Sequence, residues 1–205
     1  MQQPSETTPM KNFQFESFLA PVDLPVLAES VRASWGWLES LRELRPFALT
    51  LAGDVLLIDR SNAIYFLDTC YGVVERVASS NAALRSRLQD PHFACSILRT
   101  DLVLELRSRR VLAKHNQCFA FVLSPRIGGI AQADRMHPID FRVHLDLLGQ
   151  MARGLQHMVV GDELHIALRV FPKGKSPRAK RGGLCVQPRD RPSFSESEQV
   201  ETAVA

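Results

Sequence analysis

The fold class is decided by residues 47–67, which read FALTLAGDVLLIDRSNAIYFL. Three short runs of β-branched, aromatic and aliphatic residues are separated here by two turn signals, Gly53 and the segment Asp59-Arg60-Ser61-Asn62. Strand-forming runs bounded by such turn residues are typical of antiparallel strands joined by tight turns. We therefore predict a β-meander, and the following run, Val73–Val77, extends it by a further strand.

Helical periodicity flanks this meander. Between Asp23 and Leu41, apolar residues recur at steps of three and four, which predicts an amphipathic helix with Trp35 on its buried side. The same periodicity returns in residues 81–88 and 91–109. Strands and helices that segregate along the chain are typical of an α+β domain. The predicted fold is α+β, with an antiparallel sheet of five to seven strands and helices mainly on one face.

The last third of this domain is predicted to contain three more strands and a helix. Residues 119–123 form an apolar run typical of a buried strand. In residues 140–146, apolar and polar side chains alternate, which predicts a strand with one apolar and one polar face. A helix is expected after it, beginning at Leu147, and a final alternating strand at 163–170.

Length and composition indicate one folded domain with two tails. A chain of 205 residues with 45% hydrophobic and 23% charged residues is long enough and apolar enough for one core. We expect residues 1–11 to be disordered, 12–171 to form a single domain, and 172–205 to be a disordered tail, first basic and then acidic. No apolar run has the length of a membrane span and no signal peptide is evident, so we expect a cytoplasmic protein.

The net charge of +3 comes from the C-terminal tail. Residues 173–205 carry seven Lys or Arg against four Asp or Glu, whereas the first 172 residues carry 18 of each kind. The basic segment KGKSPRAKRGG lacks interleaved aromatic residues on which bases would stack. We therefore do not expect direct binding to nucleic acid.

Motifs of catalysis and cofactor binding are absent from the sequence. It contains no GxGxxG, GxxxxGK[ST], HExxH or GxSxG. One cluster mixes imidazole and carboxylate groups, as a divalent metal site would, but Arg142 lies within it and its cation would repel a metal. The members of this cluster are His137, Asp140, His144 and Asp146. The four cysteines show no CxxC spacing and are interpreted as reduced thiols. We predict no metal, no cofactor and no enzymatic activity.

Three blocks of sequence carry a resemblance to a known family. They are GDVLLIDRSNAIYFLDT at 53–69, QCFAFVLSPRIGG at 117–129 and DFRVHLDLLGQM at 140–151. The order of these blocks resembles the C-terminal domain of immunity proteins paired with type VI secretion DNase toxins, which usually follows a GAD-like (glutamyl-tRNA amidotransferase related) segment. The sequence departs from the family pattern where Phe119-Ala120 replaces Tyr-Gly and Met151-Ala152 replaces Ile-His. The region before Gly53 is also too short for a full GAD-like domain.

The resemblance implies a non-catalytic immunity protein that binds and neutralises a cognate type VI secretion toxin, a DNase in this family. Its partner is then the secreted toxin, with no membrane involved. Two other functions stay open at this point. One is an effector-loading adaptor or regulator of the same secretion system. The other is a hydrolase or nuclease, which would need a catalytic metal held by His137, Asp140 and His144.

Six residues are predicted to contact the partner: Asp59, Tyr65, Asp68, Asp140, His144 and Asp146. Carboxylates near strand ends can mimic phosphates and pair with the basic cleft of a nuclease. The last three are expected to share one solvent-exposed face of the strand predicted at 140–146. The alternative is that each Asp only ends a strand or caps a helix.

Overall fold

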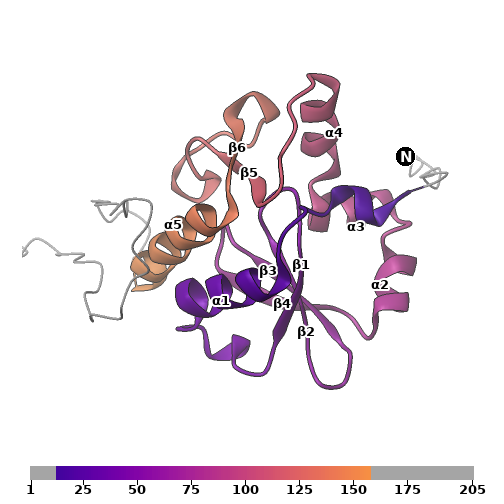
Figure 1. Ribbon diagram of the computed structural model, residues 1–205, viewed down its shortest axis with the longest axis vertical. Helices are drawn as coiled ribbons and strands as arrows, with labels where there is room; N and C mark the ends of the chain where they lie inside the picture. Colours follow the sequence, from indigo (N-terminus) through magenta and orange to yellow (C-terminus); the bar gives the residue numbers. More distant parts are fainter. Residues whose placement is uncertain (1–12, 158–205) are drawn as a thin grey trace, which may run out of the picture. The chain divides into compact units, whose positions relative to one another are not determined.

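The computed structural model describes residues 13–157 (Figure 1). The tails predicted at 1–11 and 172–205, the strand predicted at 163–170 and the end of the predicted domain at 171 lie outside these residues. Among residues 13–157, no helix combines the length and the apolar character needed to cross a membrane.

The predicted meander is confirmed. Its four antiparallel strands follow one another in the sheet in chain order, namely β1 (Arg45–Leu49), β2 (Val55–Ile58), β3 (Ile64–Asp68) and β4 (Val73–Ala78). The β2–β3 turn is held by Asp59, whose Oδ1 accepts hydrogen bonds from the backbone N–H groups of Ser61 (2.8 Å) and Ala63 (2.9 Å). Asn62 takes the left-handed conformation (φ 67°) that this tight turn requires. Local turn chemistry therefore sets the register of β2 and β3.

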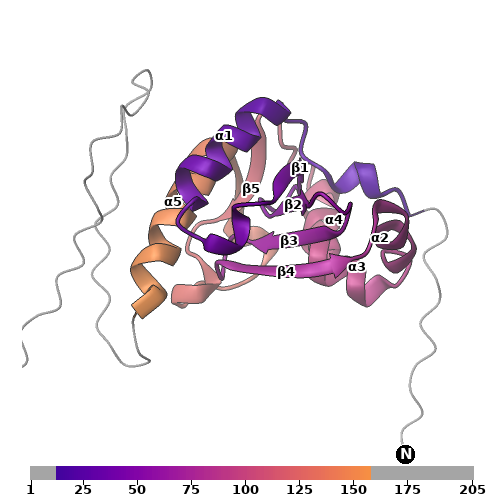
Figure 2. The same cartoon turned by 90° about the horizontal axis from the view of Figure 1, so that it is seen from below.

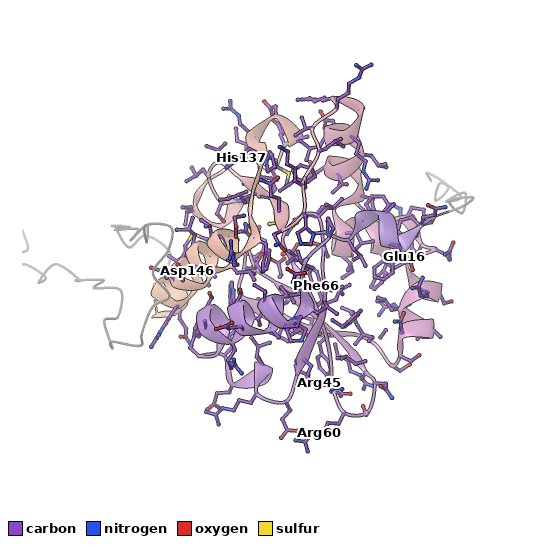
Figure 3. All side chains as sticks on the ribbon, in the orientation of Figure 1. Glu16, Arg45, Arg60, Phe66, His137 and Asp146 are labelled. Carbon is purple, nitrogen blue, oxygen red and sulfur yellow. The ribbon has the colours of Figure 1, made fainter. Side chains whose placement is uncertain are left out.

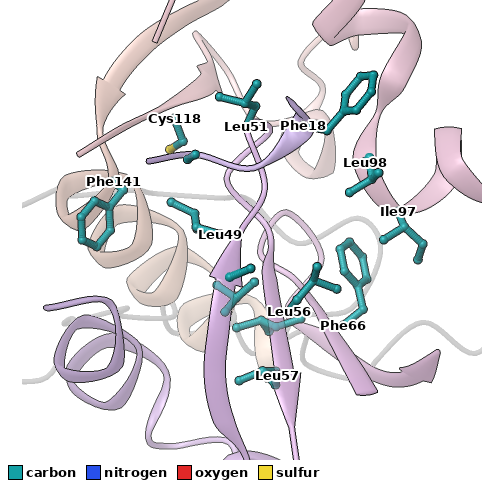
Figure 4. Close-up of a cluster of buried hydrophobic side chains, with 14 of the residues drawn as sticks. Phe18, Leu49, Leu51, Leu56, Leu57, Phe66, Ile97, Leu98, Cys118 and Phe141 are labelled. Atoms are coloured by element: carbon teal, nitrogen blue, oxygen red, sulfur yellow. The ribbon is translucent and has the colours of Figure 1, made fainter. Parts of the chain in front are cut away.

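Both faces of this sheet are covered. Three consecutive residues of β2, Val55, Leu56 and Leu57, have no exposed surface, and successive side chains of a strand point to opposite faces. Helices α1 and α5 lie on one side of the sheet, and α2, α3 and α4 lie on the other (Figures 1 and 2). The sequence, by contrast, predicts helices mainly on one face. Figure 4 shows the resulting core, with Phe66 beside Ile97 and with Leu49 toward Phe141.

The helices predicted at 81–88 and 91–109 begin and end close to where their periodicity indicates, with one interruption in the second, whereas the helix predicted between Asp23 and Leu41 already ends at Trp35. The helices before and after the meander are α1 (Leu24–Trp35), α2 (Asn81–Arg87), α3 (Pro91–Leu98) and α4 (Thr100–Ser108). Short 3-10 turns occupy Phe15–Phe18, Glu39–Leu41, Pro125–Ile127, Ala133–Arg135 and Leu155–His157. The interruption is at Arg99, whose left-handed backbone (φ 48°, ψ 48°) separates α3 from α4.

The remaining strands form a separate two-stranded sheet. Strand β5 (Gln117–Phe121) pairs antiparallel with β6 (Met136–Asp140) in an unbroken register from Gln117 opposite Asp140 to Phe121 opposite Met136. The α+β class with antiparallel strands is therefore confirmed. The described residues hold one sheet of four strands and another of two. The larger sheet therefore has fewer strands than the single sheet of five to seven that the sequence predicts.

The prediction of a strand at 140–146 is wrong, because residues 141–154 form helix α5 (Phe141–Gly154). Asp140 is its N-cap, and Asp140 Oδ1 accepts a hydrogen bond from the backbone N–H of Arg142 at 2.9 Å. Phe141, Leu145 and Ala152 are buried at spacings of four and seven, which place them on one side of a helix. Val143, which strand alternation would bury, is 44% exposed.

Helices α1 and α5 pack closely because Gly149 has no side chain. A Cβ atom at this position would lie 2.6 Å from the backbone carbonyl oxygen of Ser34 on α1. Such a distance is shorter than any ordinary van der Waals contact, so any larger residue would force the two helices apart. Gly149 weakens α5 as an isolated helix but allows it to lie against the sheet beside α1.

Candidate functional site

The centre of the molecule contains a buried carboxylate, that of Asp54. It directly follows the β1–β2 turn and is 1% exposed. Its Oδ1 accepts hydrogen bonds from the backbone N–H of Thr69 at 2.9 Å and from Thr69 Oγ1 at 3.0 Å. The backbone N–H of Asp54 donates to Thr50 Oγ1 at 3.0 Å. This carboxylate therefore fastens the end of β3 to the turn that precedes β2.

Arg99 joins the helical layer to the same carboxylate. Its Nε lies 3.4 Å from Asp54 Oδ2, and its Nη2 lies 3.4 Å from Asp68 Oδ2. A left-handed backbone costs a residue with a side chain about 1 kcal/mol or more, so it persists only where surrounding contacts hold it. Two carboxylates on the sheet provide those contacts for Arg99. The break between α3 and α4 is thus held against the ends of two strands.

His144 brings α5 to the same place. Its ring is buried, and Nε2 lies 3.4 Å from Thr69 Oγ1. Gly53 lies directly against the ring, because a Cβ atom at Gly53 would be 2.2 Å from His144 Nε2. Gly53 also has a positive φ of 89°, which favours glycine. We call Asp54, Asp68, Thr69, Arg99 and His144 the polar network.

Burial shifts the ionisation of two members of the polar network. Burial raises the pKa of Asp54 to about 6, and the charge of Arg99 only partly offsets this effect. Burial lowers the pKa of His144 to about 4, so the imidazole is neutral near pH 7. For Arg99, burial opposes the charged form, but the carboxylates of Asp54 and Asp68 outweigh burial and raise its pKa above the ordinary value. The network at neutral pH therefore combines one guanidinium, two carboxylates and a neutral imidazole.

A small cavity borders the polar network. Its volume is about 50 Å³, and its walls include Asp54, Thr69, Cys70, Arg99, Ser124 and His144. Sites for small-molecule ligands usually measure about 300 to 1,000 Å³. This cavity is large enough for water and too small for a nucleotide. Within residues 13–157, no three His, Cys, Asp or Glu side chains are placed to hold a metal ion together.

Two of the six predicted contact residues, Asp59 and Tyr65, lie at the β2–β3 turn. Asp59 organises that turn, and Tyr65 Oη lies 3.4 Å from Asp59 Oδ2. The hydroxyl and backbone N–H of Ser61 and the backbone N–H of Ala63 lower the pKa of Asp59. Asp68, a third predicted residue, belongs to the polar network, where it faces Arg99.

The other three predicted contact residues are Asp140, His144 and Asp146. They do not share one exposed face, so the prediction of such a face is wrong. Asp140 caps α5 and forms a two-pronged ion pair with Arg142 at 3.0 and 2.6 Å, which lowers the Asp140 pKa. His144 points into the core, and Asp146 Oδ2 accepts a hydrogen bond from Gln150 at 2.9 Å. Figure 3 shows Asp146 on α5 far from Arg60, the neighbour of Asp59. Contact between these acidic residues and a partner stays a prediction.

Three members of the polar network were not among the predicted site residues: Asp54, Thr69 and Arg99. Asp54 and Thr69 stand in the sequence block at 53–69, and a lone Asp directly before the apolar run of β2 indicates a buried, paired carboxylate. Arg99 gives no comparable signal, since it is one of many arginines in a helical stretch. Its role depends on contacts with residues 31 and 45 positions away.

Comparison with known proteins agrees with the resemblance of the sequence. Over part of its length, the chain is similar to an immunity family of the type VI secretion system. Specifically, residues 78–152 match the family described as T6SS immunity protein Tdi1, C-terminal. The matched range includes Arg99 and His144 and begins at the last residue of β4. A GAD-like segment is not part of this match.

One solved structure is also similar, the crystal structure of Atu4351 from Agrobacterium tumefaciens. The two sequences are 16% identical, the TM-score is 0.43, and the similarity covers 62% of this chain and 64% of that chain. This chain thus spans less than two thirds of the length of that structure. No curated protein matches the chain.

The contact between Gly53 and His144 generates a first prediction. Gly53→Ala should lower the free energy of unfolding by about 2 kcal/mol or more, because it adds both a steric overlap and backbone strain. The same substitution made together with His144→Ala should cost less, because only the strain remains. Urea denaturation of the four proteins measures both costs.

Gly128→Ala is the matched control for this prediction. Gly128 has a similar φ of 92°, but nothing lies within 4 Å of the position that its Cβ would take. Its substitution should show the cost of backbone strain alone, about 1 kcal/mol. An equal cost of Gly53→Ala in the presence and absence of the His144 ring would contradict the proposed contact.

A second prediction concerns acid. The folded protein keeps His144 neutral down to about pH 4, while the unfolded chain protonates it near pH 6.5. The contribution of His144 is therefore fully present above pH 6.5 and is lost as the pH falls toward 4. The stability difference between wild type and His144→Gln should shrink by up to about 3 kcal/mol over this range.

Asp54 has the opposite effect on how stability depends on pH. The difference in unfolding free energy between wild type and His144→Gln removes this effect. The raised pKa of Asp54 makes its contribution greatest at low pH, and that contribution is lost as the pH rises toward 6. Both proteins retain Asp54, so its effect cancels. Chemical denaturation at pH 4, 5, 6 and 7 gives the four differences, and a constant difference would show that His144 titrates as it does in the unfolded chain.

Proposed function

We propose that this chain neutralises a cognate type VI secretion toxin, a DNase, by binding it stoichiometrically in the cytoplasm of the producing cell. The observation that carries this proposal is the match of residues 78–152 to the immunity family. An immunity protein acts by occupying its toxin, so the relevant chemistry is that of a surface and not that of a pocket.

The polar network supports a binding role because its groups are satisfied by one another. Both oxygens of the Asp54 carboxylate face donors from Thr69 and Arg99. The neighbouring cavity of about 50 Å³ leaves no space for a segment of DNA. These buried polar groups therefore hold the fold together, and a partner would meet the outer surface.

The network also indicates that more than the matched segment takes part. Arg99 and His144 come from the matched range, whereas Asp54, Asp68 and Thr69 come from the meander before it. Removing the meander would leave Arg99 without both of its carboxylates. The functional unit of the immunity protein is thus the meander and the matched segment together.

The third prediction tests this function directly. Co-expression of the chain with the toxin encoded by the neighbouring gene should yield a complex with one copy of each protein, measured by light scattering. Degradation of plasmid DNA by the purified toxin should decline in proportion to the amount of chain added and should stop at one equivalent. Complete loss of toxin activity with less than one equivalent of the chain would contradict stoichiometric binding.

Two results would replace the proposed function. Binding to a spike or structural protein of the secretion system, with undiminished toxin activity, would favour the adaptor. Metal-dependent cleavage of DNA by the chain alone would show an enzyme. The immunity role would be supported if the full-length chain protects cells that express the toxin and a variant that lacks the residues before Asp68 does not.

A further inference from the structure

The loop between β5 and β6 presents large apolar side chains to solvent. Val122 is 70% exposed, Leu123 49% and Ile130 56%. Tyr71, in the turn between β3 and β4, is 49% exposed. These four residues are four of the nine large apolar residues that are exposed in the described part of the chain. Three of them belong to one loop, and large apolar side chains grouped on a surface mark a site of association, whereas scattered ones do not.

This loop is rigidly built. The backbone N–H of Gly129 donates to the carbonyl of Ser124 at 3.0 Å, and Ser124 Oγ accepts a hydrogen bond from the backbone N–H of Arg126. The two sides of the loop are so close that a Cβ at Gly129 would lie 1.9 Å from the Leu123 carbonyl oxygen. Little conformational entropy would therefore be lost when a partner covers the loop.

Contacts with the β3–β4 turn join Tyr71 to the loop. Arg126 Nη1 donates to the Tyr71 carbonyl at 2.6 Å, and Cys70 Sγ lies 3.3 Å from Ser124 Oγ. These two contacts hold the turn against the loop. We call the resulting surface the Tyr71 patch, which consists of Tyr71, Val122, Leu123, Arg126 and Ile130.

The charge of the Tyr71 patch is positive. Among the contacts of the described residues, Arg126 donates to a carbonyl and forms no ion pair with a carboxylate. Tyrosine and arginine side chains, moreover, contribute most often to the binding energy of protein interfaces. A partner that fits this surface has an apolar depression with carboxylates at its rim.

We propose that the Tyr71 patch is the surface that holds the toxin, at an acidic and apolar site of the toxin. This inference rests on the proposed function. The cleft with which a nuclease binds DNA phosphates is basic. The patch would be repelled by such a cleft, so the contact lies elsewhere on the toxin and differs from the phosphate mimicry expected from the acidic residues of the sequence.

A second copy of this chain fits the patch less well than the toxin does. In a two-fold symmetric dimer, the same surface on both copies comes together. None of the five residues of the patch carries a carboxylate, so the patch of a second copy offers Arg126 no acidic partner. An acidic partner supplies one.

The fourth prediction compares three substitutions of equally exposed residues. Leu123→Glu and Tyr71→Glu place a carboxylate in the patch, whereas Leu24→Glu places one at the start of α1, where the leucine is 48% exposed. The full-length variants are titrated with the neighbouring gene's toxin by calorimetry. We expect Kd to rise on the order of 10- to 100-fold for the two patch variants and less than about twofold for Leu24→Glu.

A charge comparison accompanies these variants. Arg126→Gln should weaken binding and make it less dependent on salt, because an ion pair with the toxin is lost. Arg60→Gln, at the exposed β2–β3 turn, should change neither property. Thermal unfolding of every variant establishes that it is folded at the temperature of the titration.

The outcomes separate this inference from the proposed function. Wild-type binding that survives both patch substitutions would overturn the patch and leave the immunity role intact, and loss of binding in Asp146→Ala instead would restore the acidic surface. No binding by the wild type would overturn the function itself. A patch variant that converts a dimer into a monomer in sedimentation would show a second copy in place of the toxin. If the backbone amides of the patch exchange faster with solvent after deletion of residues 158–205 than in the full-length chain, the chain's own C-terminal segment occupies the patch.

Discussion

A charged group removed from water must be paired, and the Asp54 carboxylate is the group on which this structure depends. Leaving a buried charge without its partner typically costs about 3 to 5 kcal/mol, a large part of the stability of a small domain. Asp54 meets this requirement with Thr69, directly after β3, and with Arg99 between α3 and α4. One carboxylate thereby connects a tight turn, a strand end and a break between helices.

Other features of the chain follow from that constraint. Arg99 keeps a left-handed backbone because its side chain must reach Asp54 and Asp68. Gly53 lacks a side chain, which leaves space for the His144 ring beside Thr69. The first and third sequence blocks that resemble the immunity family thus meet around one buried group. These blocks maintain the fold, while the exposed Tyr71 patch lies on a turn and a loop, where a change of residue costs little stability.

The parts that could be predicted from the sequence are those with local causes. The meander was predictable because Gly53 and Asp59 make turns within a few residues of the strands they join. Helix α5 was mistaken for a strand because Phe141, Val143 and Leu145 alternate, and its helical period becomes evident only when Ala152 is included. Arg99 could not be recognised because its partners lie far away in the sequence. The same reason hid the burial of His144.

The most direct test of this account is a double-mutant cycle on Asp54→Ala and Arg99→Ala, with unfolding free energies measured in urea at pH 7. If the two charges compensate each other in the core, each single substitution leaves a buried charge without its main partner. The double variant should then lose at least about 1 kcal/mol less than the sum of the two single losses. Additive losses would contradict the account, because they would mean that the Asp54 carboxylate and the Arg99 guanidinium stabilise the fold independently.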